Sequence, residues 1–396
     1  MSEREIPRAW RSAADVIGLV RDLGARSLSV DIDQRFADGA ANVAAIEAMA
    51  SFGLFGLTLP SRYGGLGRDY VALAAACEEL GKIDTAHQVA LTVHLALAAM
   101  CILQWGSDTQ RDEWLPLLAR GQRLATFALT EPGAGSDVAA LRMRARPVDG
   151  GYLLNGEKTW ISGVSDADVV VMFATVDPAL RHRGITSFIV PMDTRGLSIT
   201  ALHGKFGLRA GDTGAIACHD VFVPGNGVLG EVGEGFVVAL SALGNGLFTV
   251  GAGALGIAAE CRRLAAAFLR EIGDTGLGLH GAALARMHSR ETRARALLAA
   301  AAELKNAGMP NGRETGLAKW SSARAAHENA SDALGVVQAH STGEHAALLR
   351  HWANAKGAVI YGGTSEIHQV MQAGYALGSR VERPFRRPSP AATDLA

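Results

Sequence analysis

The segment FALTEPGAGSDV, residues 127–138, carries the residue types best suited to hold a ligand. Thr130 and Ser136 place hydroxyl groups on either side of a Pro-Gly-Ala-Gly turn. Gly133 and Gly135 let the backbone come close to a ligand, and exposed amides in such a turn bind an anion or the polar edge of a ring. Taken alone, the segment also fits a turn that binds nothing.

A second segment, NGEKTWISG at residues 155–163, predicts a glycine turn that leads into a strand. Trp160 lies on this strand between Thr159 and Ser162. A tryptophan in this place can stack against an aromatic cofactor while the adjacent backbone bonds the polar edge of the ring. The alternative is a tryptophan of the core.

A third segment, KFGLRAGDT at residues 205–213, is a glycine-punctuated loop, and on its own Arg209 and Asp212 predict a surface ion pair there. The three segments, in this order and spacing, resemble the acyl-CoA dehydrogenase family. A fourth segment, IYGGTSEIHQV at residues 360–370, is similar to the C-terminal motif of the same family. The resemblance runs from residue 30 to residue 378, nearly the whole chain.

The predicted elements agree with this order of all-α, β and all-α regions. Residues 1–125 are predicted to be an N-terminal all-α domain, residues 126–225 a middle β-barrel or β-sandwich domain, and residues 226–378 a C-terminal helical bundle. The fold class is α+β, and the resemblance implies a four-helix bundle for the last domain. The predicted helices are Ala41–Met49, Tyr70–Leu80, Phe236–Leu269, Gly281–Ala307, Thr315–Val337 and Ala346–Ala355, and the predicted strands are Gly151–Asn155, Val169–Ala174, Ile185–Pro191 and Leu197–Leu202.

The resemblance implies that FAD binds between the β domain and the C-terminal helices of a homodimer or homotetramer. Residue by residue, it implies contacts to the flavin ring, the substrate side, the diphosphate or the adenosine. The residues that match these family positions are Phe127, Leu129, Thr130, Gly135, Ser136, Trp160, Ile161, Ser162, Gln338, Thr342, Thr364 and Glu366.

The chain differs from the family at the residue that acts as the catalytic base. The family removes an α-proton of an acyl thioester with a Glu while the β-hydrogen leaves as hydride to flavin N5. The commonest position of that Glu is occupied here by Gly362, after Tyr361, and the alternative position on the first long C-terminal helix falls at Gly246. The catalytic residue is therefore unknown, and the candidate replacements, each also explained as structural or solvent-facing, are His340, Glu344 and His345.

Two further family motifs are altered. In QAHST, residues 338–342, Ser341 and Thr342 replace the glycines of a stretch that touches FAD from a neighbouring subunit, and residues 270–281 match poorly an Arg and Phe-Gly motif that helps to hold FAD. The sequence GAGALG at residues 251–256 fits a dinucleotide-binding pattern, but it lies within a helical region. Its small residues are interpreted as close helix packing.

Composition limits the remaining classes of function. With 38 Lys and Arg against 39 Asp and Glu, the 396-residue chain has a net charge of -1, which gives no field to attract nucleic acid or an anionic membrane. Four scattered Cys without a CxxC pair predict no metal site and a reducing, cytoplasmic location. We expect no signal peptide and no membrane span, a buried helix over Val89–Trp105, and a disordered tail over residues 379–396.

The sequence leaves three catalytic functions and one non-catalytic role for this chain. An FAD-dependent oxidoreductase would act on an acyl or hydroxyacyl thioester of CoA or acyl carrier protein, as in making polyketide extender units. An ordinary α,β-dehydrogenase would place its base elsewhere, and a flavin monooxygenase would use the same fold with oxygen. A binding protein would reduce no flavin. The electron acceptor implied by the resemblance is an electron-transferring flavoprotein, with oxygen as the alternative.

Overall fold

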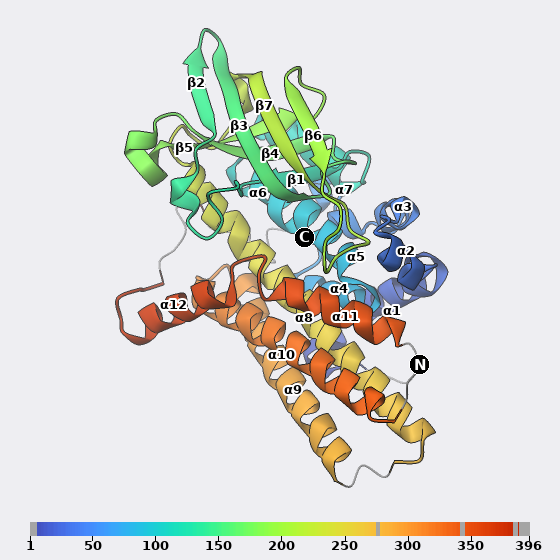
Figure 1. The fold of residues 1–396 in the computed structure, drawn as a ribbon. Coiled ribbons are helices and arrows are strands. Elements are labelled where there is room, and N and C mark those ends of the chain that lie inside the picture. The colour runs from blue at the N-terminus through green and yellow to red at the C-terminus, as the bar shows by residue number, and fades with distance from the viewer. Residues whose placement is uncertain (1–5, 275–277, 341–344, 383–386, 388–396) are drawn as a thin grey trace.

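The computed structural model describes residues 6–274, 278–340, 345–382 and 387. Within these ranges a group of N-terminal helices is followed by one β-sheet and then by long C-terminal helices (Figure 1). The predicted order of all-α, β and all-α regions is therefore confirmed. Most of the predicted tail, residues 379–396, lies outside the described residues.

The N-terminal helices begin at side chains that cap their first turns. Asp69 accepts a hydrogen bond from the amide of Ala72, and Asp84 accepts one from the amide of Ala86, so that two helices follow each other with only Asp84 between them. The helices are α1 (Ala14–Leu23), α2 (Ile32–Asp38), α3 (Val43–Ser51), α4 (Tyr70–Ile83), α5 (Thr85–Leu91), α6 (Met100–Trp105) and α7 (Asp108–Ala119), and a π-helical segment, Thr92–Ala99, joins α5 to α6.

Two helical segments are long and apolar enough to cross a membrane, Thr85–Trp105 and Gly235–Glu271. Their most apolar windows are 78% and 67% buried inside the fold, so both are core helices of this structure. The prediction of a buried helix over Val89–Trp105 is confirmed.

The middle region forms one eight-stranded sheet in the order β6-β7-β3-β2-β4-β5-β8, and β1 pairs in parallel with β4. The strands are β1 (Ala125–Ala128), β2 (Arg144–Val148), β3 (Gly151–Ser162), β4 (Val169–Thr175), β5 (Ile185–Pro191), β6 (Leu197–Ala201), β7 (Thr213–Pro224) and β8 (Val228–Leu229). All four predicted strands are present, and β3 continues seven residues beyond its predicted end. The sequence did not reveal β2, because its residues, RARPV, are mostly polar and exposed.

The C-terminal helices are α8 (Gly235–Glu271), α9 (Leu279–Asn306), α10 (Gly312–Gln338), α11 (Ala346–Ala358) and α12 (Ser365–Ala376). Figure 1 shows α8 running from the sheet to the far end of the bundle, alongside α9 and α10. The glycines at residues 251–256 lie within α8, as predicted. A Cβ on Gly256 would lie 2.1 Å from the carbonyl oxygen of Glu78, so this glycine allows α4 and α8 to touch backbone to backbone.

Candidate functional site

The turn at residues 127–138 is anchored from beneath by a buried ion pair. The carboxylate of Glu131 accepts hydrogen bonds from the amides of Arg142 and Met143 and from Lys158 Nζ, the last at 2.8 Å. Lys158 also donates to the carbonyl oxygen of Leu129 at 3.0 Å. The neighbouring backbone is thus fixed, while Gly135 stays exposed, with open space where a side chain would lie.

The strand that carries Trp160 is distorted at this residue. Trp160 has a φ of 60°, a left-handed conformation that is unfavourable for a bulky side chain, and the β3–β7 register shifts between Lys158 and Ile161. The indole is 63% exposed, whereas Ile161 beside it is 2% exposed. Trp160 is therefore a surface tryptophan held in a strained conformation, and the alternative of a core residue is wrong.

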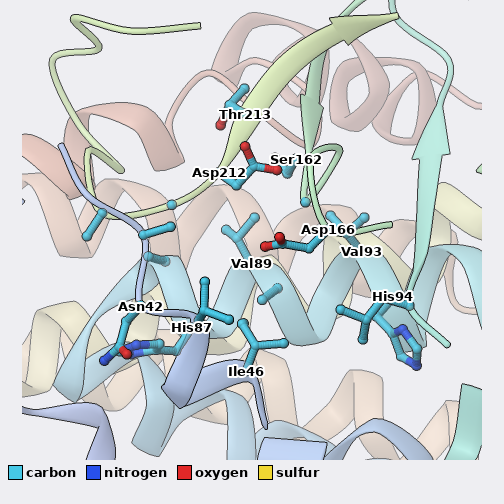
Figure 2. Close-up of a pocket in the computed structure, with 18 of the residues that line it drawn as sticks. Asn42, Ile46, His87, Val89, Val93, His94, Ser162, Asp166, Asp212 and Thr213 are labelled. Atoms are coloured by element: carbon cyan, nitrogen blue, oxygen red, sulfur yellow. The ribbon is translucent and has the colours of Figure 1, made fainter. Parts of the chain in front are cut away.

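A cavity opens beside Ser162, between the N-terminal helices and the sheet (Figure 2). Its walls are mainly apolar and include Ile46, Val89 and Val93. Figure 2 shows the Asp166 carboxylate directed into this space. Asp166 has no hydrogen-bond or ion-pair partner in the part of the chain that the structure describes.

The electrostatics of this cavity are set by two carboxylates. Partial burial and the neighbouring Asp212 raise the pKa of Asp166. Asp212 itself accepts hydrogen bonds from the amide and the hydroxyl of Ser165. Arg209 donates instead to the carbonyl oxygens of Phe36 and Ala37, so the predicted Arg209–Asp212 ion pair is wrong.

The loop before α12 contains two adjacent glycines, Gly362 and Gly363, with φ values of 61° and 82°. A Cβ on Gly362 would lie 3.5 Å from a methyl group of Val250, so this position faces α8. A Cβ on Gly246, one turn earlier on α8, would lie 2.6 Å from a methyl group of Leu97. Both positions that matched a family Glu therefore lie along the same helix, and both are without a side chain.

Two buried basic groups hold this loop from behind. Lys319 Nζ on α10 donates to the carbonyl oxygen of Gly363 at 2.6 Å, and His368 Nε2 on α12 lies 3.3 Å from that of Gly362. Both side chains are 1% exposed. Burial lowers the pKa of Lys319 to about 7, and burial together with Lys319 lowers the pKa of His368 to about 4.

The other predicted cofactor contacts are distributed over the ends of the helices and strands. Phe127 and Leu129 are buried at the end of β1, and the ring of Phe127 lies 5.0 Å from that of Phe173. Thr364 caps α12 by accepting a hydrogen bond from the amide of Ile367, and Glu366 is exposed in the first turn. The remaining positions are Thr130, half-buried after β1, Ser136, exposed on the turn, and Gln338, exposed at the end of α10.

The candidate replacement bases lie at the opposite end of α10. His340 is exposed, and His345 precedes α11; Thr342 and Glu344 lie outside the described residues. His340 Nε2 is 3.3 Å from His280 Nε2, and His280 Nδ1 is 2.8 Å from a carboxylate oxygen of Asp274. The sequence predicted no metal site, yet this is a group whose ligand atoms are close enough to hold an ion. This group of Asp274, His280 and His340 connects the two altered motifs, residues 270–281 and 338–342.

Three family models match the chain end to end. They are the acyl-CoA dehydrogenase N-terminal domain at residues 14–122, the middle domain at residues 126–221 and the C-terminal domain at residues 233–377. The chain belongs to the acyl-CoA dehydrogenase family. The resemblance drawn from the four sequence motifs is confirmed.

The relatives include an acyl-CoA dehydrogenase of Bacillus subtilis, 35% identical over 84% of this chain and 89% of the relative. A glutaryl-CoA dehydrogenase of Mycobacterium smegmatis, solved with FADH2, superposes with a TM-score of 0.88 at 28% identity, over 96% of this chain and 98% of the other. A prolyl acyl carrier protein oxidase superposes with a TM-score of 0.87 at 27% identity, over 92% and 98%.

Acyl-CoA dehydrogenases bind FAD, and the residues of this chain fit that cofactor. Trp160, strained and 63% exposed, offers accessible aromatic surface, as a ring cofactor requires. The turn above the Glu131–Lys158 pair offers backbone with open space at Gly133 and Gly135. The cofactor is therefore FAD, and these residues would hold its ring and its polar edge.

Sequence reasoning missed the buried groups Lys158, Lys319 and His368 and the carboxylate of Asp166 in the cavity. Lys158 was detectable in principle, since it lies on a predicted strand with a glutamate at residue 131 of the neighbouring motif. Lys319 and His368 gave no such signal, because their shared partner is a backbone loop that neither is near in sequence.

Proposed function

We propose that this family member is an FAD-dependent oxidoreductase that oxidises an acyl or hydroxyacyl thioester, bound to CoA or to acyl carrier protein, in secondary metabolism. The observation that carries this proposal is that the four family motifs are present while Gly246 on α8, and Gly362 facing α8 from the loop before α12, supply no carboxylate. When bound, FAD supplies the hydride acceptor. The carrier-protein alternative is supported by the similarity to a prolyl acyl carrier protein oxidase.

A hydroxyacyl substrate suits a site without the family Glu. Its oxidation removes a hydride from the carbinol carbon and a proton from the hydroxyl oxygen, and yields a carbonyl group. An oxygen-bound proton passes to water or to a weak base more readily than a carbon-bound α-proton, which is weakly acidic and needs a positioned base. The missing side chain at residue 362 also leaves space next to α8 for a branched or polar acyl group, since nothing in the described part of the chain lies closer than 3.5 Å to a Cβ built there.

One observation favours a second candidate, α,β-dehydrogenation of an ordinary acyl-CoA with a relocated base. Asp166 points into the cavity beside Ser162, has no partner among the described residues, and has a raised pKa because of partial burial and Asp212. A raised pKa makes this carboxylate a stronger base than an ordinary aspartate, which suits it to accept a proton.

For the assembly we propose a homodimer or homotetramer in the cytoplasm. Large apolar side chains are exposed at several places, among them Phe206, Ile360 and Val370, which are 58%, 57% and 69% exposed. Residues of this kind are commonly covered in an oligomer. An electron-transferring flavoprotein or oxygen would reoxidise the flavin.

The test is anaerobic mixing of the purified holoprotein with saturated acyl-CoAs, hydroxyacyl-CoAs and hydroxyacyl carrier proteins while the visible flavin absorbance is recorded. Bleaching by hydroxyacyl thioesters alone supports the main proposal. Bleaching by a saturated acyl-CoA, lost in Asp166→Asn but retained in the matched variant Asp168→Asn, supports the relocated base. A yellow protein that no thioester reduces contradicts both, and rapid oxygen consumption by its reduced form would indicate a monooxygenase.

A further inference from the structure

The Gly362–Gly363 loop needs an external restraint to hold one conformation. Two adjacent glycines have more backbone freedom than any other residue pair, and both are in the left-handed region here. A Cβ on Gly363 would lie 3.0 Å from His368 Nε2, so a side chain at this position would press against His368. The loop and the side chains behind it therefore fit as one unit.

The restraint acts on the carbonyl groups of the loop. His368 contacts the carbonyl oxygen of Gly362, and Lys319 donates to that of Gly363. In a trans peptide the N–H points away from the C=O of the same unit. Holding both carbonyls toward α10 and α12 thus turns the amides of Gly363 and Thr364 away from these helices.

The amides of this loop are available to a ligand. In the described part of the chain, the N–H groups of Gly362, Gly363 and Thr364 have no acceptor. The next amide along the chain, that of Ser365, bonds the carbonyl oxygen of Val359 and closes the loop. Consecutive free backbone donors, two of them in peptide units held from behind, are the arrangement that stabilises negative charge on an oxygen atom.

Burying these two side chains is unfavourable in itself. Lys319 is 1% exposed, and its only hydrogen bond among the described groups is to the Gly363 carbonyl, with no carboxylate to balance its charge. Buried His368 has an Nδ1 atom without a partner among the described residues. Shape alone would be satisfied by apolar residues, so the basic groups point to a role in the loop itself.

We propose that Lys319 and His368 are positioning residues that hold the Gly362–Gly363 loop with its amide groups presented to the thioester carbonyl of the substrate. The proposal rests on the thioester substrate proposed above. Polarisation of the carbonyl by backbone amides needs no side chain at residue 362, so it survives the loss of the family Glu. It makes the loop a site of substrate activation, although it carries no acid or base.

The experiment compares Lys319→Met with Lys305→Met as a matched control. Lys305 on α9 is also buried and also has its pKa lowered to about 7 by burial, but it donates to Asn245 and does not touch the loop. For each holoprotein, flavin content, unfolding temperature, the Kd of the reducing thioester and the rate constant of anaerobic flavin reduction are measured. We expect Lys319→Met to lower the rate constant by about 10²-fold with a change in Kd of less than about fivefold, and Lys305→Met to leave both nearly unchanged.

Hydrogen exchange separates a failure of this proposal from a failure of the proposed function, because it needs no substrate. The amide of Ser365, which bonds the carbonyl oxygen of Val359 and closes the loop, should exchange at least about tenfold faster in Lys319→Met and in His368→Leu than in Lys305→Met, and His368→Gln, which keeps a donor, should restore slow exchange. Equal exchange in all variants, or equal loss of rate in both lysine variants, overturns the proposal. If no thioester reduces the wild-type protein but the variants still differ in exchange, only the proposed substrate is wrong.

Discussion

Glu131 and Lys158 form a buried ion pair, with Lys158 Nζ 2.8 Å from the Glu131 carboxylate, at the base of the turn at residues 127–138. Their side chains are 7% and 0% exposed. Glu131 belongs to the turn and Lys158 to the strand that carries Trp160, so the pair links the two motifs expected on either side of the flavin ring. The site thus depends on a contact that touches no ligand.

Removing one partner of this pair should be costly. Lys158→Met leaves a buried carboxylate uncompensated, and we expect the free energy of unfolding to fall by about 3–5 kcal/mol, with loss of bound FAD on purification. Denaturant unfolding of the apoprotein measures this loss. The double variant Glu131→Gln/Lys158→Met should lose less than the sum of the single variants, and simple additivity would show that the pair is uncoupled.

The variant Trp160→Gly should weaken FAD binding without lowering the stability of the apoprotein. Glycine relieves the left-handed strain of about 1–2 kcal/mol per residue, offset in part by its greater freedom when unfolded. We expect apoprotein stability to stay level or to rise by up to about 1 kcal/mol, while the Kd for FAD rises at least tenfold because the aromatic face is lost. Fluorescence titration with FAD gives the Kd, and Trp160→Phe, which keeps a ring, should bind more tightly than Trp160→Gly. Unchanged affinity in both would remove Trp160 from the cofactor site.

Most of the fold could be predicted from the sequence because long segments with periodic apolar residues indicate helices and strands clearly. The helix predicted at Phe236–Leu269 is α8, Gly235–Glu271, and the strand at Ile185–Pro191 has the predicted bounds. The strand β7 was not among the predicted strands, because Gly, Asp and His interrupt its apolar pattern. The helix α12 was hidden within a motif that begins as a glycine loop.

The candidate site was predictable where chemistry lies in contiguous motifs and not where it depends on distant contacts. The glycines at residues 246 and 362, where the resemblance implies a glutamate, lie in such motifs and were found from the sequence alone. The clamp on residues 362–363 could not, since Lys319 lies 44 residues from the carbonyl it bonds. Asp166 was overlooked because its significance depends on a cavity built from α3, α5 and the sheet.

Restoring a carboxylate should be easier at Gly246 than at Gly362. Gly362 has a φ of 61°, so a glutamate there carries backbone strain of about 1–2 kcal/mol, whereas Gly246 has helical geometry and needs only a shift of the Leu97 side chain. We expect Gly246→Glu/Leu97→Ala to raise the rate of flavin reduction by a saturated acyl-CoA by about 10²-fold or more, as a general base does. Gly246→Gln/Leu97→Ala is the isosteric control, and equal rates in the two variants would show that residue 246 lies out of reach of the α-carbon.

Because of Lys305, the free energy of unfolding of the protein should increase as the pH rises above about 7. Burial lowers its pKa from 10.5 to about 7, so between these values the unfolded chain binds a proton that the folded chain does not. Stability from this group therefore rises with pH above about 7, and the cost of burying the ammonium group is fully present below it. Between pH 7 and 8.5 we expect the free energy of unfolding of the wild type to increase by about 1–2 kcal/mol relative to Lys305→Met, measured by urea unfolding at both pH values. Since Lys319 titrates in the same range in both proteins, only the difference between them reports on Lys305, and parallel pH curves would mean that the hydrogen bond to Asn245 keeps the amine charged.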